Sequence, residues 1–328
     1  MRGSWLSGIA LSLISALVLA DEPGGSVASP TSDEPEGMEV VVVTGMQPGP
    51  GLWKVSKGNH VLWILGEISP YPRMTQWKST KFDRLLRGSQ ELIIDYSGYW
   101  KLTRSNGEAY SRAEKLPEGT ALKDVISPEL HRRVEDTAKL FGTPGLEEFH
   151  AFSVTNRLVM SAMSTLDLTG FSARFAADAL AKKRRVKTTH FSAPEPPFEV
   201  RLQNWQQASN AVCLERLVKA IGDGGNGVKR LANAWSVGDI DALRRLVPAY
   251  SFSRDGFRAD ECAAAMRGGE QQAREYDAKR RQAWLAEAER ALSNNRSTMA
   301  VVLMSEIFAP DGYLAGLRAR GYEIVEPE

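Results

Sequence analysis

The sequence predicts an α/β protein with a mixed central sheet flanked by helices. Three observations predict this class. Short apolar runs of strand length precede and follow segments with helical spacing, and long helical segments fill the middle and second half of the chain. The last thirty residues combine a strand-like run, Met299–Met304, with a short helical pattern and the alternating segment Tyr322–Val325. We therefore expect a helical insert and a helix-rich C-terminal half that closes on a final β-α-β.

The first elements form a hairpin and a crossover. The runs Leu52–Val55 and Val61–Leu65 flank Lys57–Asn59, whose Gly-Asn pair is typical of a hairpin turn. The spacing of Thr75–Arg87 then predicts a helix, and Glu91–Tyr96 predicts another strand. Strand, helix and strand in this order favour a parallel crossover.

The middle of the chain has helical periodicity. Residues 128–185 predict the helical insert, and Val186–His190 predicts a short strand before a Pro-rich break. The helices expected after the break are Asn204–Ile221, Val228–Val237, Ile240–Val247 and Ala259–Leu292, the last divided by Gly268 and Gly269.

The C-terminal block places an acid beside a helix start. Glu306 follows the Met299–Met304 strand, Asp311 is expected to cap the next helix, and Gly321 suits the left-handed position at its end. Acidic groups at the carboxyl ends of strands are typical of ligand sites in α/β proteins.

Composition indicates a globular chain without a polyanion partner. The 328 residues are 43% hydrophobic and 25% charged, with a net charge of +1. One large domain, residues 38–328, accommodates this core. A nearly neutral chain has no field to attract nucleic acid, so nucleic acid is not an expected partner.

The N-terminus has the pattern of a signal peptide. Arg2 precedes the apolar run Leu6–Leu19, and Val18 and Ala20 occupy the −3 and −1 positions of a cleavage site, so we expect cleavage after Ala20. The run is shorter than a membrane-spanning helix requires, so no transmembrane span is expected in the mature chain. Residues 21–37 have a disordered composition. The protein is therefore expected to be periplasmic or secreted.

Only two cysteines occur, Cys213 and Cys262. Because an exported chain meets an oxidising compartment, we expect them to form one disulfide.

Several blocks, in order, carry a family resemblance across residues 50–328. They are Leu52–Val55 with Val61–Gly66, Trp77–Asp95, the turn residues Ala234, Trp235, Gly238 and Asp239, Arg280 with Trp284, and the C-terminal residues Pro310, Asp311, Gly312, Leu314, Leu317, Arg318, Gly321 and Tyr322. In this order they resemble the TraB/GumN family, which is related to the Tiki metalloproteases. The resemblance implies a metal-dependent hydrolase on an α/β fold.

The chain departs from the family pattern at its histidines. Where the family has Gly-x-x-His, this chain has Gly66 and Ser69, with Glu67 between them. Where the family ends a strand in Gly-Ala-Gly-His, this chain has Leu303–Glu306. Asp95 stands at the family's acidic strand end, and His190 falls in a segment that aligns loosely. The resemblance is thus to a divergent member that lacks the family histidines.

A substitute metal site is one implication of the resemblance. Glu67, Asp95 and Glu306, with His190 as a further candidate, would offer mostly oxygen ligands, which favour Mg²⁺, Ca²⁺ or Mn²⁺ over zinc. Arg280 either pairs with a carboxylate near this site or is a surface charge.

We expect the catalytic site, composed of Glu67, Ser69, Asp95 and Glu306, to be degraded. The protein would then be a binding or accessory protein of the cell envelope, with no cofactor and with a peptide, glycan or envelope protein as partner. An active metal-dependent hydrolase or peptidase is the alternative, and a purely structural envelope scaffold is a third.

Overall fold

The computed structural model describes residues 45–72, 75–77, 80–96, 103–169, 173–193, 196–207, 211–250 and 261–327. The expected signal peptide and the expected disordered segment at residues 21–37 lie outside the described residues, so both remain predictions.

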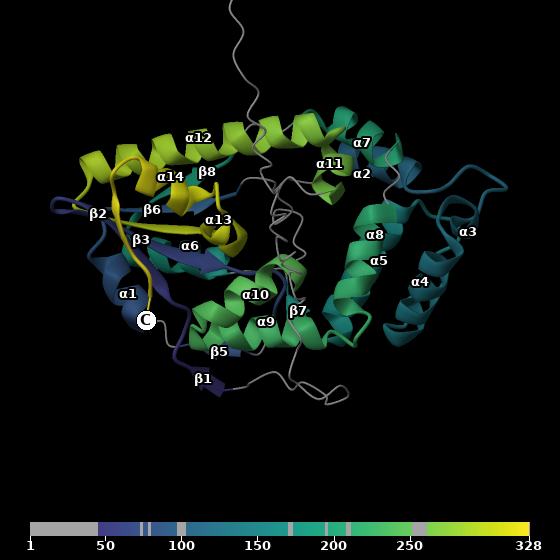
Figure 1. Cartoon of the computed structure of the whole chain (residues 1–328), viewed down its shortest axis with the longest axis horizontal. Helices are drawn as coiled ribbons and strands as arrows, with labels where there is room; N and C mark the ends of the chain where they lie inside the picture. Colours follow the sequence, from purple (N-terminus) through teal and green to yellow (C-terminus); the bar gives the residue numbers. More distant parts are fainter. Residues whose placement is uncertain are drawn as a thin grey trace, which may run out of the picture. The chain divides into compact units, whose positions relative to one another are not determined.

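One mixed six-stranded sheet organises the described residues (Figure 1). Its strands are β2 (Leu52–Lys57), β3 (His60–Glu67), β6 (Glu91–Asp95), β8 (Lys187–Phe191), β9 (Ser297–Leu303) and β10 (Glu323–Val325), in the spatial order β10-β2-β3-β9-β6-β8. The strands β3, β9, β6 and β8 are parallel, whereas β2 is antiparallel to both β3 and β10. The carboxyl ends of four strands therefore meet at one edge of the sheet.

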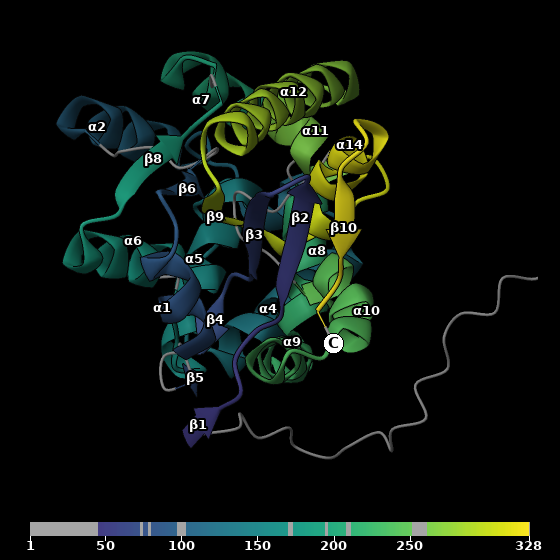
Figure 2. The ribbon, with the colours of Figure 1, turned by 90° about the vertical axis from the view of Figure 1, so that its left-hand side faces the viewer.

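Helices cover both faces of this sheet. Helix α12 (Glu270–Asn294) runs along one face, while α1 (Thr80–Arg87) and α6 (Ala173–Arg184) lie against the other (Figures 1 and 2). Strand β9 is buried at every position after Ser297, because it lies at the centre of a sheet that is covered on both faces. The mixed α/β class and the parallel crossover from β3 to β6 are confirmed.

A helical region with its own apolar cluster occupies the predicted insert and continues beyond it. Its helices are α3 (Leu122–Val125), α4 (Pro128–Leu140), α5 (Ala151–Thr165), α8 (Ala211–Ile221) and the start of α9 (Asn226–Val237). The other helices are α2 (Arg104–Ala113), α7 (Phe198–Gln207), α10 (Ile240–Tyr250), α11 (Glu261–Arg267), α13 (Met304–Phe308) and α14 (Tyr313–Ala319). Among the described helices, none combines the length and the apolar character needed to cross a bilayer.

Three sequence expectations are corrected. Thr75–Trp77 is not the start of a helix but a short strand, β5, which pairs in parallel with β1 (Gly45–Gln47), so α1 begins only at Thr80. The pairing partner β1 has no strong strand pattern of its own, so the local sequence could not reveal the pair.

The second correction concerns the helix expected over Asn204–Ile221. The structure has two helices there: α7 begins earlier, at Phe198 just after Pro197, and α8 begins at Ala211. The third concerns Asp311, which does not cap α14. The N-cap residue is Gly312, and the Asp311 carboxylate instead pairs with Arg281 of α12.

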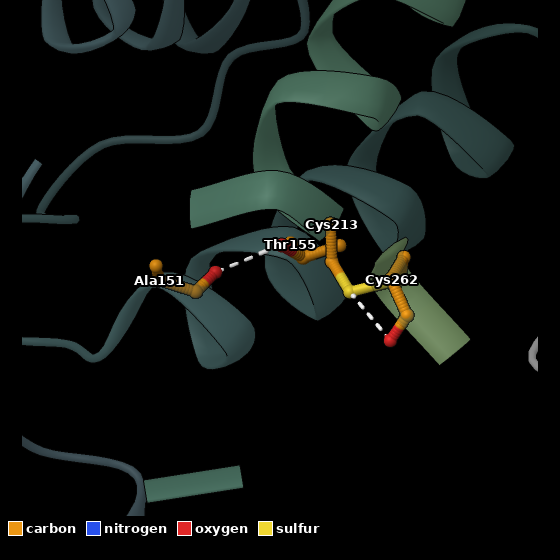
Figure 3. Close-up of a disulfide and its surroundings, with 4 residues drawn as sticks. All are labelled: Ala151, Thr155, Cys213 and Cys262. Carbon is orange, nitrogen blue, oxygen red and sulfur yellow. Dashed lines mark hydrogen bonds between the residues drawn. A yellow bond between two sulfur atoms is a disulfide. The ribbon is translucent and has the colours of Figure 1, made fainter. Parts of the chain in front are cut away.

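The predicted disulfide is present. Cys213 on α8 is bonded to Cys262 on α11, and both residues are buried next to α5 (Figure 3). Thr155 of α5 lies beside them and donates its hydroxyl to the Ala151 carbonyl at 2.8 Å. The bond thus ties α11, and through it the start of α12, to the helical region.

Replacing both cysteines with alanine is expected to lower the free energy of unfolding by about 2–4 kcal/mol, because the unfolded chain is no longer constrained by a loop of this length. Urea denaturation of the oxidised protein and of the double variant measures the difference. Reducing the unchanged protein should reproduce the loss, and an unchanged denaturation midpoint would contradict this role for the bond.

Candidate functional site

Three buried carboxylates gather at the carboxyl edge of the parallel strands. Glu67 is the last residue of β3, Asp95 is the last residue of β6, and Glu306 lies in the short helix that follows β9. In the sheet register Glu67 stands opposite Leu303 of β9, while Ile94 stands opposite Val301. All three side chains belong to residues less than 4% exposed. Ser69 lies in the loop just after Glu67 and is partly buried.

Glu67 is held by Arg174 from the first turn of α6. The backbone N–H of Arg174 donates to Oε2 of Glu67 at 3.1 Å, and its guanidinium group bonds Oε1. The first N–H groups of a helix have no partner within the helix, so Glu67 also satisfies the start of α6. The partial positive charge of a helix N-terminus favours a carboxylate at this place.

Glu306 also pairs with a buried arginine, Arg280 of α12. The two side chains form a buried ion pair, and each is about 3% exposed. Burial acts to lower the pKa of Arg280, but the charge of Glu306, with Tyr313 and Asp95 nearby, outweighs it and raises the pKa well above its usual value. Arg280 is therefore a buried, permanently charged partner rather than a surface charge.

Asp95 accepts a hydrogen bond from a residue of helix α14. The Tyr313 hydroxyl donates to Oδ2 of Asp95 at 2.8 Å, and the Tyr313 ring stacks on Trp284 with centroids 4.0 Å apart. Burial, followed by the negative charge of Asp95, raises the pKa of Tyr313 well above its usual value. The phenol thus stays protonated and remains a hydrogen-bond donor.

Replacing Tyr313 with phenylalanine is expected to lower the free energy of unfolding by about 1.5–3 kcal/mol, because a hydrogen bond to a charged group is lost while the stacking on Trp284 is kept. Denaturant titration measures the change. Replacing Tyr110 with phenylalanine is a control for the loss of an uncharged hydrogen bond, because its partly buried hydroxyl accepts from Nδ2 of Asn156 at 3.0 Å. An equally small effect of both changes would show that the Tyr313 bond contributes little.

Two supporting residues from the sequence have different surroundings. Gly66 has no room for a side chain, because a Cβ there would lie 2.6 Å from Sδ of Met304, and its carbonyl accepts from Nε1 of Trp235 at 2.8 Å. His190 is exposed on β8, where its Nε2 is 3.2 Å from Asp178. His190 is therefore engaged by a partly buried acid, Asp178, and is not one of the partners of the three buried carboxylates.

The sequence analysis missed two members of this cluster, Arg174 and Tyr313, and one buried acid on α12, Asp277. Arg174 and Tyr313 carry no motif that marks them, since their partners come from distant segments of the chain. Asp277 lies on α12, three residues before Arg280, and is about 6% exposed. Among the residues that the structure describes, neither of its carboxylate oxygens has a hydrogen-bond partner. A buried carboxylate without a partner is costly, so this position indicates a place for a missing partner.

The metal site that the resemblance implies does not fit these residues. A metal ion needs three or four ligands directed at one point. Here the carboxylates of Glu67 and Glu306 are each committed to a buried arginine, and Asp95 accepts from a tyrosine. Within the described part of the chain, no three His, Cys, Asp or Glu side chains are grouped so that they could hold an ion. Arginines at these places also repel a cation.

Comparison with protein-family models identifies the family of this chain. A model described as the TraB/PrgY/gumN family matches residues 51–326. No curated protein and no solved structure matches the chain. The matched region contains the whole six-stranded sheet and the helices that hold its three buried acids. We call these acids, Glu67, Asp95 and Glu306, the carboxylate edge. Since the match covers most of the chain, this protein belongs to the TraB/PrgY/gumN family.

Proposed function

We propose that this protein is an exported binding or accessory protein of the cell envelope in which the family's catalytic site is degraded. The observation that carries the proposal is the pair of buried arginines, Arg174 and Arg280, that neutralise the glutamates at the carboxylate edge. In this proposal, Glu67, Glu306 and Asp95 do not bind a metal ion. They hold α6, α12 and α14 to the sheet. Its partner would be a peptide, a glycan or an envelope protein.

The export part of the proposal is supported by two features. The first twenty residues have the three-part pattern of a cleaved signal peptide. The disulfide between Cys213 and Cys262 is of a kind that persists in oxidising compartments and is rare in reducing ones. Mass spectrometry of the protein recovered from a bacterial periplasm tests cleavage, and the expected mature chain begins at Asp21.

A hydrolysis assay tests the loss of catalysis. The purified mature chain is incubated with a denatured protein substrate and with Mg²⁺, Ca²⁺, Mn²⁺, Co²⁺ or Zn²⁺ in turn, and cleavage is followed by mass spectrometry. The expected result is no cleavage above that of a Glu306→Gln variant prepared in the same way. Metal-dependent cleavage that the variant loses would overturn the proposal.

An active hydrolase is the second candidate, and Asp277 favours it. Among the described residues its buried carboxylate has no hydrogen-bond partner, and it lies on the same helix as Arg280, so it is a candidate acid or base in a rearranged site. If this candidate holds, Asp277→Asn abolishes the cleavage described above while the folded state is kept. If the binding proposal holds, Asp277→Asn instead stabilises the protein or leaves it unchanged, because a buried unpaired acid is removed.

A further inference from the structure

Within the described part of the chain, strand β8 is an edge of the sheet, and part of its backbone has no hydrogen-bond partner there. It stands at the end of the strand order, and among the described strands it pairs with β6 alone. The carbonyl of Phe191 accepts from the Tyr96 N–H at 2.7 Å, so the backbone of Phe191 is directed toward β6. Because backbone groups alternate along a strand, those of Thr188 and His190 are directed away from β6. No described residue beyond the β6 ladder bonds their backbone.

The usual protections of an edge strand are weak at β8. Proteins protect such edges with prolines, outward-directed lysines or very short strands. The opposite edge, β10, has only three residues and is closely followed by Pro327. Strand β8 has five residues and no proline. Its single lysine, Lys187, is directed back to β6, with Nζ 3.1 Å from Oε1 of Glu91.

The segment that leads into β8 is strongly basic. Five cations lie between positions 182 and 187. Lys182, Arg184 and Lys187 are paired with acids. Lys183 and Arg185 are exposed, and within the described part of the chain neither has an ion-pair partner. Excess positive charge at the start of an open edge attracts an acidic partner.

The positive charge near β8 favours an acidic segment of another protein over a second copy of this chain. If two copies of this chain paired through β8, the same cations would be brought together from both copies, which is unfavourable. An extended segment of another protein with acidic side chains would instead satisfy both the backbone groups and the cations. Such strand addition is a common mode of peptide recognition, in which the backbone provides affinity and the side chains provide specificity.

We propose that the β8 edge, defined as the outward backbone of Thr188 and His190 together with Lys183 and Arg185, binds an extended acidic peptide as an added strand. This inference does not depend on the loss of catalysis at the carboxylate edge, because β8 would bind such a peptide in an active or an inactive protein. Its failure would therefore leave the proposed function unaffected.

Fluorescence polarisation tests the proposal with the mature chain. The probe is a fluorescein-labelled nonapeptide of alternating valine and threonine with two glutamates at each end. Saturable binding is expected. The same peptide with alternate backbone nitrogens methylated on the edge that faces β8 is expected to bind at least tenfold more weakly, since its donors to the strand are lost. No saturable binding, or equal binding of both peptides, would overturn the proposal.

Protein variants separate backbone from charge. Thr188→Pro removes an outward N–H without touching the β6 ladder and should weaken binding about tenfold, whereas the control Thr188→Val, which keeps that N–H, should not. Lys183→Gln combined with Arg185→Asn should weaken binding several-fold and reduce its dependence on salt. Circular dichroism checks that each variant is folded. Equal binding by Thr188→Pro and Thr188→Val, or a dimer that Thr188→Pro converts to a monomer, would contradict the proposal.

Discussion

Replacing Arg280 with methionine is expected to lower the free energy of unfolding by about 3–5 kcal/mol. The change leaves Glu306 buried at about 2% exposure without its counter-charge. The cost is that of an uncompensated buried charge rather than of the lost attraction alone. Chemical denaturation with a two-state analysis measures it.

A paired variant distinguishes charge from packing at this position. When Glu306 is also changed to methionine, both charges are removed and the stability is expected to return to the original value or above it, because replacing a buried ion pair with apolar side chains of similar volume is often neutral or stabilising. If the double variant is as unstable as the single one, the role of Arg280 is steric and the electrostatic account of this pair is wrong.

Replacing Arg174 with methionine is expected to cost a similar amount, about 3–5 kcal/mol, because Glu67 is left buried without the guanidinium. Here the paired change behaves differently. In the Arg174→Met, Glu67→Met variant the backbone N–H of residue 174 also loses its acceptor, Oε2 of Glu67. We therefore expect about 1–3 kcal/mol of the loss to remain.

The comparison of the two paired variants is the informative result. Recovery should be nearly complete at the Arg280 and Glu306 pair and incomplete at the Arg174 and Glu67 pair, since only the second also satisfies a helix start. Thermal unfolding followed by circular dichroism provides both values. Equal recovery at the two sites would show that Glu67 does not support the first turn of α6.

The sequence predicted the strands at the centre of this fold because their signals are local. The runs around Trp63, Ile93 and Val301 are long and apolar, as expected of strands buried on both faces. The division of the last long helix at Gly268 and Gly269 was also predictable, because glycine disfavours the interior of a helix. In the structure both glycines have positive φ. The strand β5 was missed because its stability comes from pairing with β1, about thirty residues away.

The site was predicted only in part for the same reason. Strand ends identify Glu67, Asp95 and Glu306 as acids at one edge, because parallel strands align their carboxyl ends. What holds each acid depends on tertiary packing. Arg174 lies 107 residues from Glu67 and Tyr313 lies 218 residues from Asp95, and no local pattern connects such pairs. The sequence therefore could not show that Glu67 and Glu306 are paired with buried arginines. The tertiary structure shows this pairing.

Metal content is the most direct test of whether Glu67, Asp95 and Glu306, at the carboxyl edge of the sheet, bind a metal ion. The mature protein is dialysed against a mixture of Mg²⁺, Ca²⁺, Mn²⁺, Co²⁺ and Zn²⁺, then passed through a desalting column and analysed by inductively coupled plasma mass spectrometry, beside a Glu67→Gln, Glu306→Gln variant. We predict well below one ion per chain in the unchanged protein and the same content in the variant. One tightly held ion per chain that disappears in the variant would contradict the account.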